Sequence, residues 1–180
     1  NGVHAINLVI EKIREFLSKK EGWPAPEIRR SDSPISSVTN DFDRLYFPPN
    51  SPARSSVYTR YITDEMMLRT HTTAMIPDLL IEIKNKGLTD YSVLCPGICY
   101  RRDVVDKKHT GEPHQMDIWR IKKGEPKLQR LALINLIETV IESVIPRAKY
   151  RANEVTHPYT INGLEVEILV NGEWLELLEC

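Results

Sequence analysis

The sequence is poor in several features that would assign it to a specialised class of protein. Its 180 residues include only 3 cysteines, an odd number that is too small for a disulfide framework. Such low cysteine usage favours a reducing compartment, and we therefore predict a cytoplasmic location. No apolar run approaches the roughly 20 residues of a membrane span, and no signal peptide opens the chain, so we predict no membrane contact.

Net charge is the other missing feature. Lys and Arg number 24 and Asp and Glu number 25, which gives a formal net charge of -1. No global basic field therefore points to nucleic-acid binding, and any site for a polyanion must be local. Hydrophobic residues make up 41% and charged residues 27%, which is typical of a globular domain. The chain begins at Asn1 without Met and ends at Cys180 inside a strand-like run, so it reads as part of a longer protein.

Hydrophobic periodicity predicts three helices, over residues 3–20, 74–86 and 126–145. Pro77 is compatible with the first turn of the second helix, and Gly87 is a typical stop signal. The Ser-, Pro- and Asn-rich stretch 31–56 is predicted to be a loop. Predicted strands cover residues 57–63, 93–95, 98–105, 115–121, 164–170 and 173–179.

The order of these elements indicates the fold class. Asn171-Gly172 between the last two strands predicts a two-residue hairpin turn. Helices and strands do not alternate one for one, which argues against a doubly wound sheet. We therefore predict an α+β fold, with an antiparallel sheet flanked by helices.

Polar residues concentrate around the predicted hairpin of strands 98–105 and 115–121. If these strands pair in antiparallel fashion, four polar residues alternate in phase and project from one face of the sheet, namely Arg101, Asp103, Gln115 and Asp117. The tip between the strands carries Lys107, Lys108 and His109. Cations suit phosphate and carboxylates suit an ammonium or a metal, so the hairpin is a candidate site for a nucleotide and a zwitterionic small molecule. The alternative is an exposed hairpin with cross-strand ion pairs.

A family resemblance rests on four stretches in a fixed order. Residues 95–117 (CPGICYRRDVVDKKH…PHQMD) resemble motif 2 of class II aminoacyl-tRNA synthetases, and more narrowly of the phenylalanyl-tRNA synthetase alpha subunit. Residues 52–54 with 58–61, residues 68–73 (LRTHTT) and residues 157–160 with 172–176 resemble three further segments of that family. Four ordered matches over residues 34–180 are more specific than any single one. The resemblance implies a class II synthetase-like fold.

The resemblance also implies an ATP site. Arg101 would be the motif 2 arginine that grips the α-phosphate of ATP, and Asp103 would contact the adenine amino group or orient its neighbours. His109, on the loop, would reach the β- and γ-phosphates. Glu165 and Glu176 are candidates for coordinating Mg²⁺ around the triphosphate.

The implied amino-acid site has two parts. The α-ammonium would be held by four polar residues, namely His71, Thr73, Gln115 and Asp117, although the family has Glu where Asp117 stands. The pocket for the substrate side chain would include His157 and Tyr159, where the family has two phenylalanines. Because both substitutions add polar atoms, the pocket is expected to favour a substrate other than phenylalanine.

The resemblance predicts a ligase that activates an amino acid, or a similar carboxylate, with ATP to an adenylate. Transfer to tRNA, ligation to a non-tRNA acceptor by a paralogue, and a non-catalytic synthetase-derived interaction module remain alternatives. We predict one domain over residues 1–180, with an N-terminal helix and candidate dimer interface in 1–30 and the motif-bearing core in 31–180. A homodimer or hetero-oligomer is expected. The glycine-rich motif 3 of the family has no counterpart in these 180 residues and is expected beyond Cys180.

Overall fold

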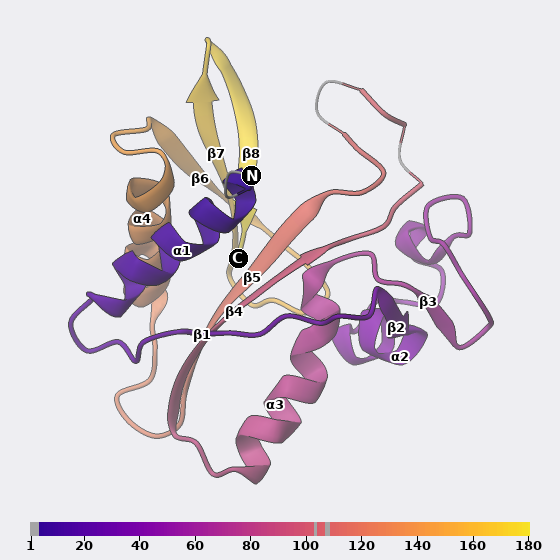
Figure 1. Cartoon of the computed structure of the whole chain (residues 1–180), viewed down its shortest axis with the longest axis horizontal. Helices are drawn as coiled ribbons and strands as arrows, with labels where there is room; N and C mark the ends of the chain where they lie inside the picture. The colour runs from indigo at the N-terminus through magenta and orange to yellow at the C-terminus, as the bar shows by residue number, and fades with distance from the viewer. Residues whose placement is uncertain (1–3, 103, 107–108) are drawn as a thin grey trace. The chain divides into compact units, whose positions relative to one another are not determined.

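The computed structural model of the protein describes residues 4–102, 104–106 and 109–180. The chain divides into two compact units. Figure 1 labels the helices and strands. Unit 1 combines the residues up to Ala25 with those from Lys122 onward, and unit 2 spans Pro26–Ile121. Each unit is described by itself. The single domain expected from the sequence stays a prediction.

Unit 2 is built on a three-stranded sheet in the order β1-β4-β5. The strands are β1 (Glu27–Ile28), β4 (Asp90–Ile98) and β5 (His114–Lys122), and β1 pairs with β4 in parallel. Beyond the end of β4, the N–H of Cys99 donates to the carbonyl of Pro113 and the N–H of Arg101 donates to that of Gly111, both at 2.9 Å. Partner numbers fall as the chain advances, so this hairpin is antiparallel, as predicted.

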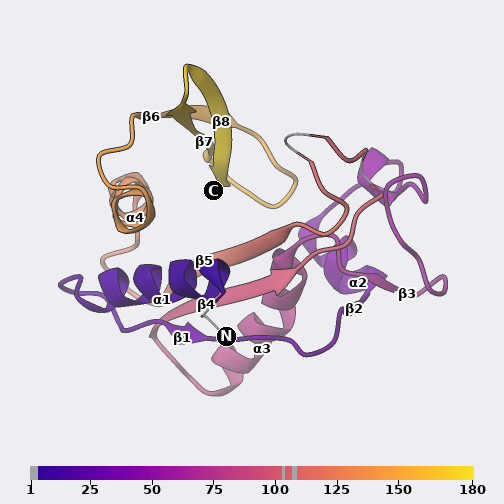
Figure 2. The ribbon, with the colours of Figure 1, turned by 45° about the horizontal axis from the view of Figure 1, so that its top comes forward.

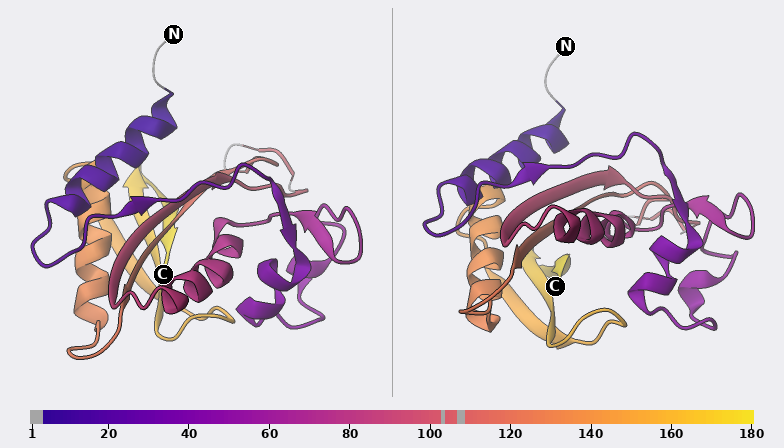
Figure 3. Two further views of the ribbon diagram at one scale, coloured as in Figure 1. Left: turned by 60° about the horizontal axis from the view of Figure 1, so that its bottom comes forward. Right: turned by 90° about the horizontal axis from the view of Figure 1, so that it is seen from below.

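Helix α3 (Ile76–Asn85) supplies the apolar cover of this sheet. Its buried face carries Ile76, Leu79 and Ile83, which pack against Val93 and Cys95 of β4. The spacing of three and four residues places these side chains on one stripe of the helix. Figure 3 shows α3 lying along the strands. The helix begins after η3 (Thr72–Met75), contains Pro in its first turn and ends before Gly87 at φ 65°, as the sequence predicts.

The predicted loop 31–56 is wrong in part, because it contains short elements. These are β2 (Ile35–Ser37), α2 (Val38–Asp41), η1 (Asp43–Leu45) and η2 (Pro52–Arg54). Ser37 starts α2, since its side chain accepts a hydrogen bond from the N–H of Asn40 at 3.1 Å. Strand β2 forms an antiparallel pair with β3 (Met66–Leu68). Short polar stretches carry too little periodicity to reveal such elements.

Two predicted strands are also wrong. Residues 57–63 form only isolated bridges, Thr59 to Arg101 and Tyr61 to Met67. The predicted strand 93–95 lies inside β4, whereas the strand predicted over 98–105 is wrong because β4 ends at Ile98. Past that point alternate residues bond to other segments, because the N–H of Tyr100 donates to the carbonyl of Arg69 and that of Arg102 donates to the carbonyl of Tyr58. These hydrogen bonds satisfy the backbone without a continuous ladder.

Unit 1 contains α1 (Ala5–Ser18), α4 (Arg130–Val144) and an antiparallel sheet of β6 (Tyr150–Val155), β7 (Gly163–Val170) and β8 (Glu173–Glu179). Ile137 and Ile141 of α4 pack against Leu164 and Val166 of β7, and α1 contacts α4. Figure 2 shows β6, β7 and β8 side by side. Strand β6 was missed by the sequence analysis, because its residues are mostly exposed and show no apolar alternation.

The final hairpin follows its sequence signal. Asn171 and Gly172 have φ values of 51° and 86°, and two positive values in succession are those of a type I′ turn. No helix in the described ranges combines the length and apolar character that crossing a bilayer would require.

Candidate active site

Asp117, on β5, is a predicted site residue whose carboxylate accepts three side-chain hydrogen bonds. Its Oδ1 accepts hydrogen bonds from the hydroxyls of Thr72 at 2.5 Å and Thr73 at 3.2 Å. Its Oδ2 accepts from Nε1 of Trp119 at 2.9 Å. The structure thus brings the predicted pair Thr73 and Asp117 together, with Thr72 and Trp119 as further partners. The carboxylate is held in one orientation, and Oδ2 keeps acceptor capacity for another donor.

Gln115 lies two residues before Asp117 and shares its face of the strand. The thiol of Cys99 donates to Oε1 of Gln115 at 3.3 Å, across the hairpin. Burial raises the pKa of Cys99 to about 12, so the thiol stays protonated and able to donate. Arg101 follows Cys99 by two residues and keeps its phase, because its backbone still bonds to Gly111. Of the four residues predicted for this face, Asp103 lies outside the described residues.

Arg101 is anchored by the segment that precedes η3. Its Nε donates to the backbone carbonyl of Thr70 at 2.9 Å, and its own carbonyl accepts from Nη2 of Arg60 at 3.1 Å. The guanidinium is therefore oriented by a contact with the backbone of Thr70. A cation held this way retains further donors for an anion.

His71 contacts two residues that the sequence analysis missed. Its Nε2 lies 3.0 Å from the carbonyl oxygen of Asp41 and 3.5 Å from the carboxylate Oδ1 of the same residue. The imidazole stacks on Phe47 with ring centroids 5.9 Å apart. Both partners come from the stretch predicted to be a loop, where no periodicity or motif marked them.

Near the hairpin tip, His109 is paired with Asp106. Nδ1 of His109 lies 2.9 Å from the carboxylate of Asp106, whose Oδ1 also accepts from the His109 N–H at 2.8 Å. Lys107 and Lys108 lie outside the described residues. The phosphate contact predicted for His109 stays a prediction.

The predicted side-chain pocket residues belong to unit 1. His157 and Tyr159 stack with ring centroids 5.8 Å apart. Nε2 of His157 lies 3.4 Å from Oε1 of Glu179, and its Nδ1 lies 3.4 Å from the hydroxyl of Thr160. Both ring nitrogens of His157 thus lie near polar atoms, whereas the family pattern has an apolar phenylalanine at this position.

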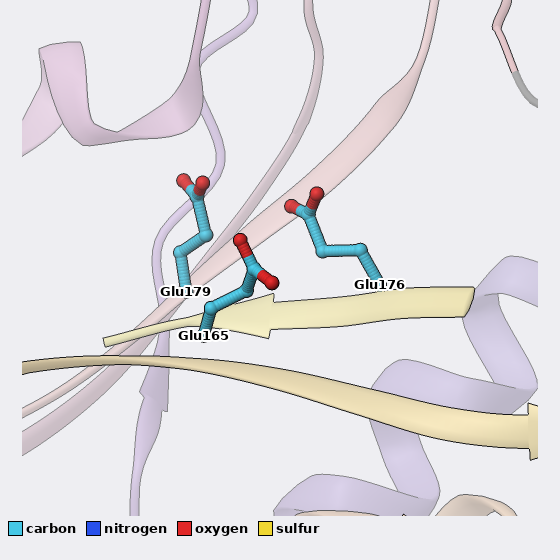
Figure 4. A group of neighbouring side chains, drawn as sticks. All are labelled: Glu165, Glu176 and Glu179. Carbon is cyan, nitrogen blue, oxygen red and sulfur yellow. The ribbon is translucent and has the colours of Figure 1, made fainter. Parts of the chain in front are cut away.

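A carboxylate cluster on β7 and β8 includes both predicted metal ligands. Glu165, Glu176 and Glu179 each offer an oxygen, and these atoms all lie within 4.8 Å of one another. Figure 4 shows the three side chains pointing to the same side of the strands. Glu179 was missed, because residues 176 and 179 would lie on opposite faces of a regular strand.

An irregularity in the pairing explains how Glu179 reaches the cluster. Glu165 pairs with Glu179, whereas Glu167 pairs with Glu176, so the register shifts by one residue between them. Leu177 is the extra residue of this bulge, and it brings Glu176 and Glu179 to one face. Glu167, also on that face, is bonded to Arg151 at 2.6 Å, which lowers its pKa. Carboxylate oxygens suit a hard cation such as Mg²⁺, which usually takes one or two of them together with substrate phosphates and waters.

The family of the chain follows from comparison with known proteins. The family model described as tRNA synthetases class II core domain (F) matches residues 1–180. The chain therefore belongs to this family of class II aminoacyl-tRNA synthetases. The fold agrees with that of the crystal structure of pyrrolysyl-tRNA synthetase from Desulfitobacterium hafniense, with a TM-score of 0.72 at 16% sequence identity. The superposition covers 96% of this chain and 57% of the synthetase chain.

Curated relatives narrow the family. The chain is 34% identical over 140 residues to the phenylalanine–tRNA ligase alpha subunit of Acaryochloris marina, covering 78% of this chain and 40% of that protein. It is 30% identical over 207 residues to the mitochondrial phenylalanine–tRNA ligase of Dictyostelium discoideum, covering 98% of this chain and 44% of that protein. The chain therefore resembles phenylalanine–tRNA ligases and spans less than half the length of these relatives.

Proposed function

We propose that the protein activates an amino acid with ATP. A carboxylate oxygen of the substrate attacks the α-phosphorus, the bond from that phosphorus to the oxygen bridging to the β-phosphate breaks, and pyrophosphate leaves. The product is an aminoacyl-adenylate. The observation that carries this proposal is made on the hairpin of β4 and β5. There Arg101, anchored by a hydrogen bond, and Asp117, which accepts three hydrogen bonds, lie in phase on one face.

Arg101 takes the α-phosphate in this proposal. Attack places additional negative charge on the phosphate oxygens, and a guanidinium already fixed by the Thr70 carbonyl meets that charge without reorganising. Asp103 and His109 are proposed for the adenine and the outer phosphates, respectively. Glu165, Glu176 and Glu179 would hold Mg²⁺, which when bound neutralises triphosphate charge.

Asp117 takes the α-ammonium group. Three protein donors already orient its carboxylate, so the substrate meets a preorganised acceptor. Gln115 lies beside it with its Oε1 fixed by Cys99, and Thr73 and His71 complete the polar environment. The α-carboxylate is then oriented for attack on the phosphate.

Substrate and acceptor are proposed from the pocket and the relatives. His157 beside Glu179 and Tyr159 adds polar atoms to the side-chain pocket, which favours an amino acid with a polar group over phenylalanine. The names of the relatives favour tRNA as acceptor, and the alpha-subunit relatives favour assembly with a second subunit. The polar pocket favours the alternative of a paralogue with another acceptor. A cytoplasmic location is part of the proposal.

ATP–pyrophosphate exchange tests the proposal with the full-length protein and each of the 20 amino acids. Arg101→Ala should lower kcat/KM by about 100-fold or more, since it removes transition-state charge stabilisation. Arg102→Ala is the matched control, because this neighbour is exposed, and it should retain activity. Absence of exchange in the wild-type protein with every amino acid would refute activation of these substrates.

A further inference from the structure

Asp41 is a fully buried carboxylate that no sequence pattern marked. It is the last residue of α2 and has 0% of its surface exposed. Its Oδ1 accepts from the hydroxyl of Thr70 at 2.6 Å and from the backbone N–H of Thr70 at 3.2 Å. Burying a carboxylate is costly unless such hydrogen bonds compensate. The two bonds therefore fix the backbone of Thr70 to α2.

Thr70 passes this constraint to Arg101. The carbonyl of Thr70 accepts the Nε–H of Arg101 at 2.9 Å, so the donor and acceptor of one residue are both engaged. The preceding residue adds a parallel connection, because the carbonyl of Arg69 accepts the N–H of Tyr100 at 2.8 Å. Asp41 is thus two hydrogen bonds away from the guanidinium that the proposed function assigns to the α-phosphate.

His71 receives a second constraint from the same residue. Its Nε2 lies 3.0 Å from the Asp41 carbonyl and 3.5 Å from the Asp41 carboxylate, while Phe47 stacks on the ring. Oδ2 of Asp41 is buried and has no hydrogen-bond partner among the described residues. A carboxylate satisfied on one oxygen only is a costly way to fill a core position, because an apolar residue would avoid that cost.

We propose that Asp41 is a positioning residue, which holds Thr70 so that Arg101 and His71 are both oriented toward the substrates. The inference rests on the proposed function, because it assigns Asp41 to the same adenylation site. Asp41 does not touch the substrate in this scheme. Its effect is transmitted through Thr70 to the ATP side and directly to His71 on the amino-acid side.

The test compares Asp41→Ala and Asp41→Asn in the full-length protein, with Asp43→Ala as control. Asp43 lies two residues further on and pairs with Arg54, and its side chain is 50% exposed. Asp41→Ala should raise KM for ATP and for the amino acid, and lower kcat, by about 10-fold or more, because displaced groups lose the reactive geometry. Asp41→Asn keeps an oxygen acceptor for Thr70 and should recover part of the loss.

A second readout does not depend on activity. Amide hydrogen exchange should accelerate in peptides covering residues 69–72 and 99–102 in Asp41→Ala, and remain unchanged there in Asp43→Ala. Acceleration confined to residues 38–45 would overturn the proposal, and so would unchanged KM values with only a lower yield of folded enzyme. If Asp41→Ala does not fold, Asp41→Asn carries both readouts. A wild-type protein without exchange activity refutes the proposed function, whereas hydrogen exchange still decides whether Asp41 orders residues 99–102.

Discussion

The two threonines that contact Asp117 should differ in their effects on stability and on substrate binding. Thr72 is 1% exposed and its hydroxyl lies 2.5 Å from Oδ1 of Asp117, whereas Thr73 is 8% exposed and lies at 3.2 Å. A hydrogen bond to a charged group contributes about 1.5–3 kcal/mol. Thr72→Val, which keeps the shape of the side chain, should therefore cost about 2 kcal/mol, and Thr73→Val about 1 kcal/mol.

Thermal unfolding measures this difference. In a chain of roughly 150–250 residues, 1 kcal/mol shifts Tm by about 2–4 °C, so Thr72→Val should lower Tm by about 4–8 °C and Thr73→Val by about half as much. The kinetic effects should be reversed in order. Thr73 belongs to the proposed ammonium site, so Thr73→Val should raise KM for the amino acid more than Thr72→Val does.

A double-mutant cycle separates the hydrogen bond from general packing effects. If the loss arises from the contact with Asp117, Thr72→Val should cost little in an Asp117→Ala background. An unchanged Tm shift in that background would refute the assignment of the energy to this bond. Equal Tm shifts for Thr72→Val and Thr73→Val would refute the ranking by distance and burial.

Four further predictions concern thiols, the substrate pocket and the carboxylate cluster. Burial raises the pKa of Cys95 and of Cys99 from 9.0 to about 12, so both thiols should resist iodoacetamide at pH 8 until the protein is denatured. The stability gained by keeping these thiols neutral is fully present below pH 9 and is lost as the pH rises from 9 toward 12, so Cys99→Val should flatten the fall in unfolding free energy over that range. Tyr159→Phe should shift exchange activity toward phenylalanine, and unchanged selectivity would contradict the pocket assignment. Glu179→Gln should raise the Mg²⁺ concentration needed for half-maximal exchange activity by about 10-fold or more. Glu173→Gln, at an exposed position of the same strand, should leave that concentration unchanged.

Local signals predicted the elements that depend on neighbouring residues. The helix of unit 2 could be predicted because Pro77 and Gly87 bracket an apolar stripe, and the last hairpin because Asn171-Gly172 accepts positive φ angles. The strand predicted at 57–63 is wrong, because the residue types there did not reveal a turn. β-branched and aromatic residues suggested it, but the backbone there turns on Ser55, which accepts N–H groups of Tyr58 and Thr59.

Candidate site residues could be named from the sequence only where a motif or an alternation of polar residues marked them. The resemblance and the alternation of the strand both marked Gln115 and Asp117. In the structure Cys99 donates a hydrogen bond to Gln115 and Thr73 donates one to Asp117. Asp41 could not be found this way, because its role depends on its hydrogen bond to Thr70, which lies 29 positions further along the chain. Non-local contacts of this kind leave no periodic trace in the sequence.

The bulge at Leu177 has a consequence for how such a carboxylate cluster can arise and be lost. Side chains in a strand alternate, so a single inserted residue rotates everything beyond it to the opposite face. The bulge absorbs the extra residue Leu177, so Glu176 and Glu179 share the face of Glu165 although they are three positions apart. If the strands paired regularly with Leu177 still present, either Glu179 or Glu176 would turn away from Glu165. A cluster of this kind can therefore appear or vanish with the gain or loss of a bulge in the strand pairing, with no change in acidic composition. Comparisons of related chains should accordingly align the pairing register of β7 and β8 before they compare residue identities.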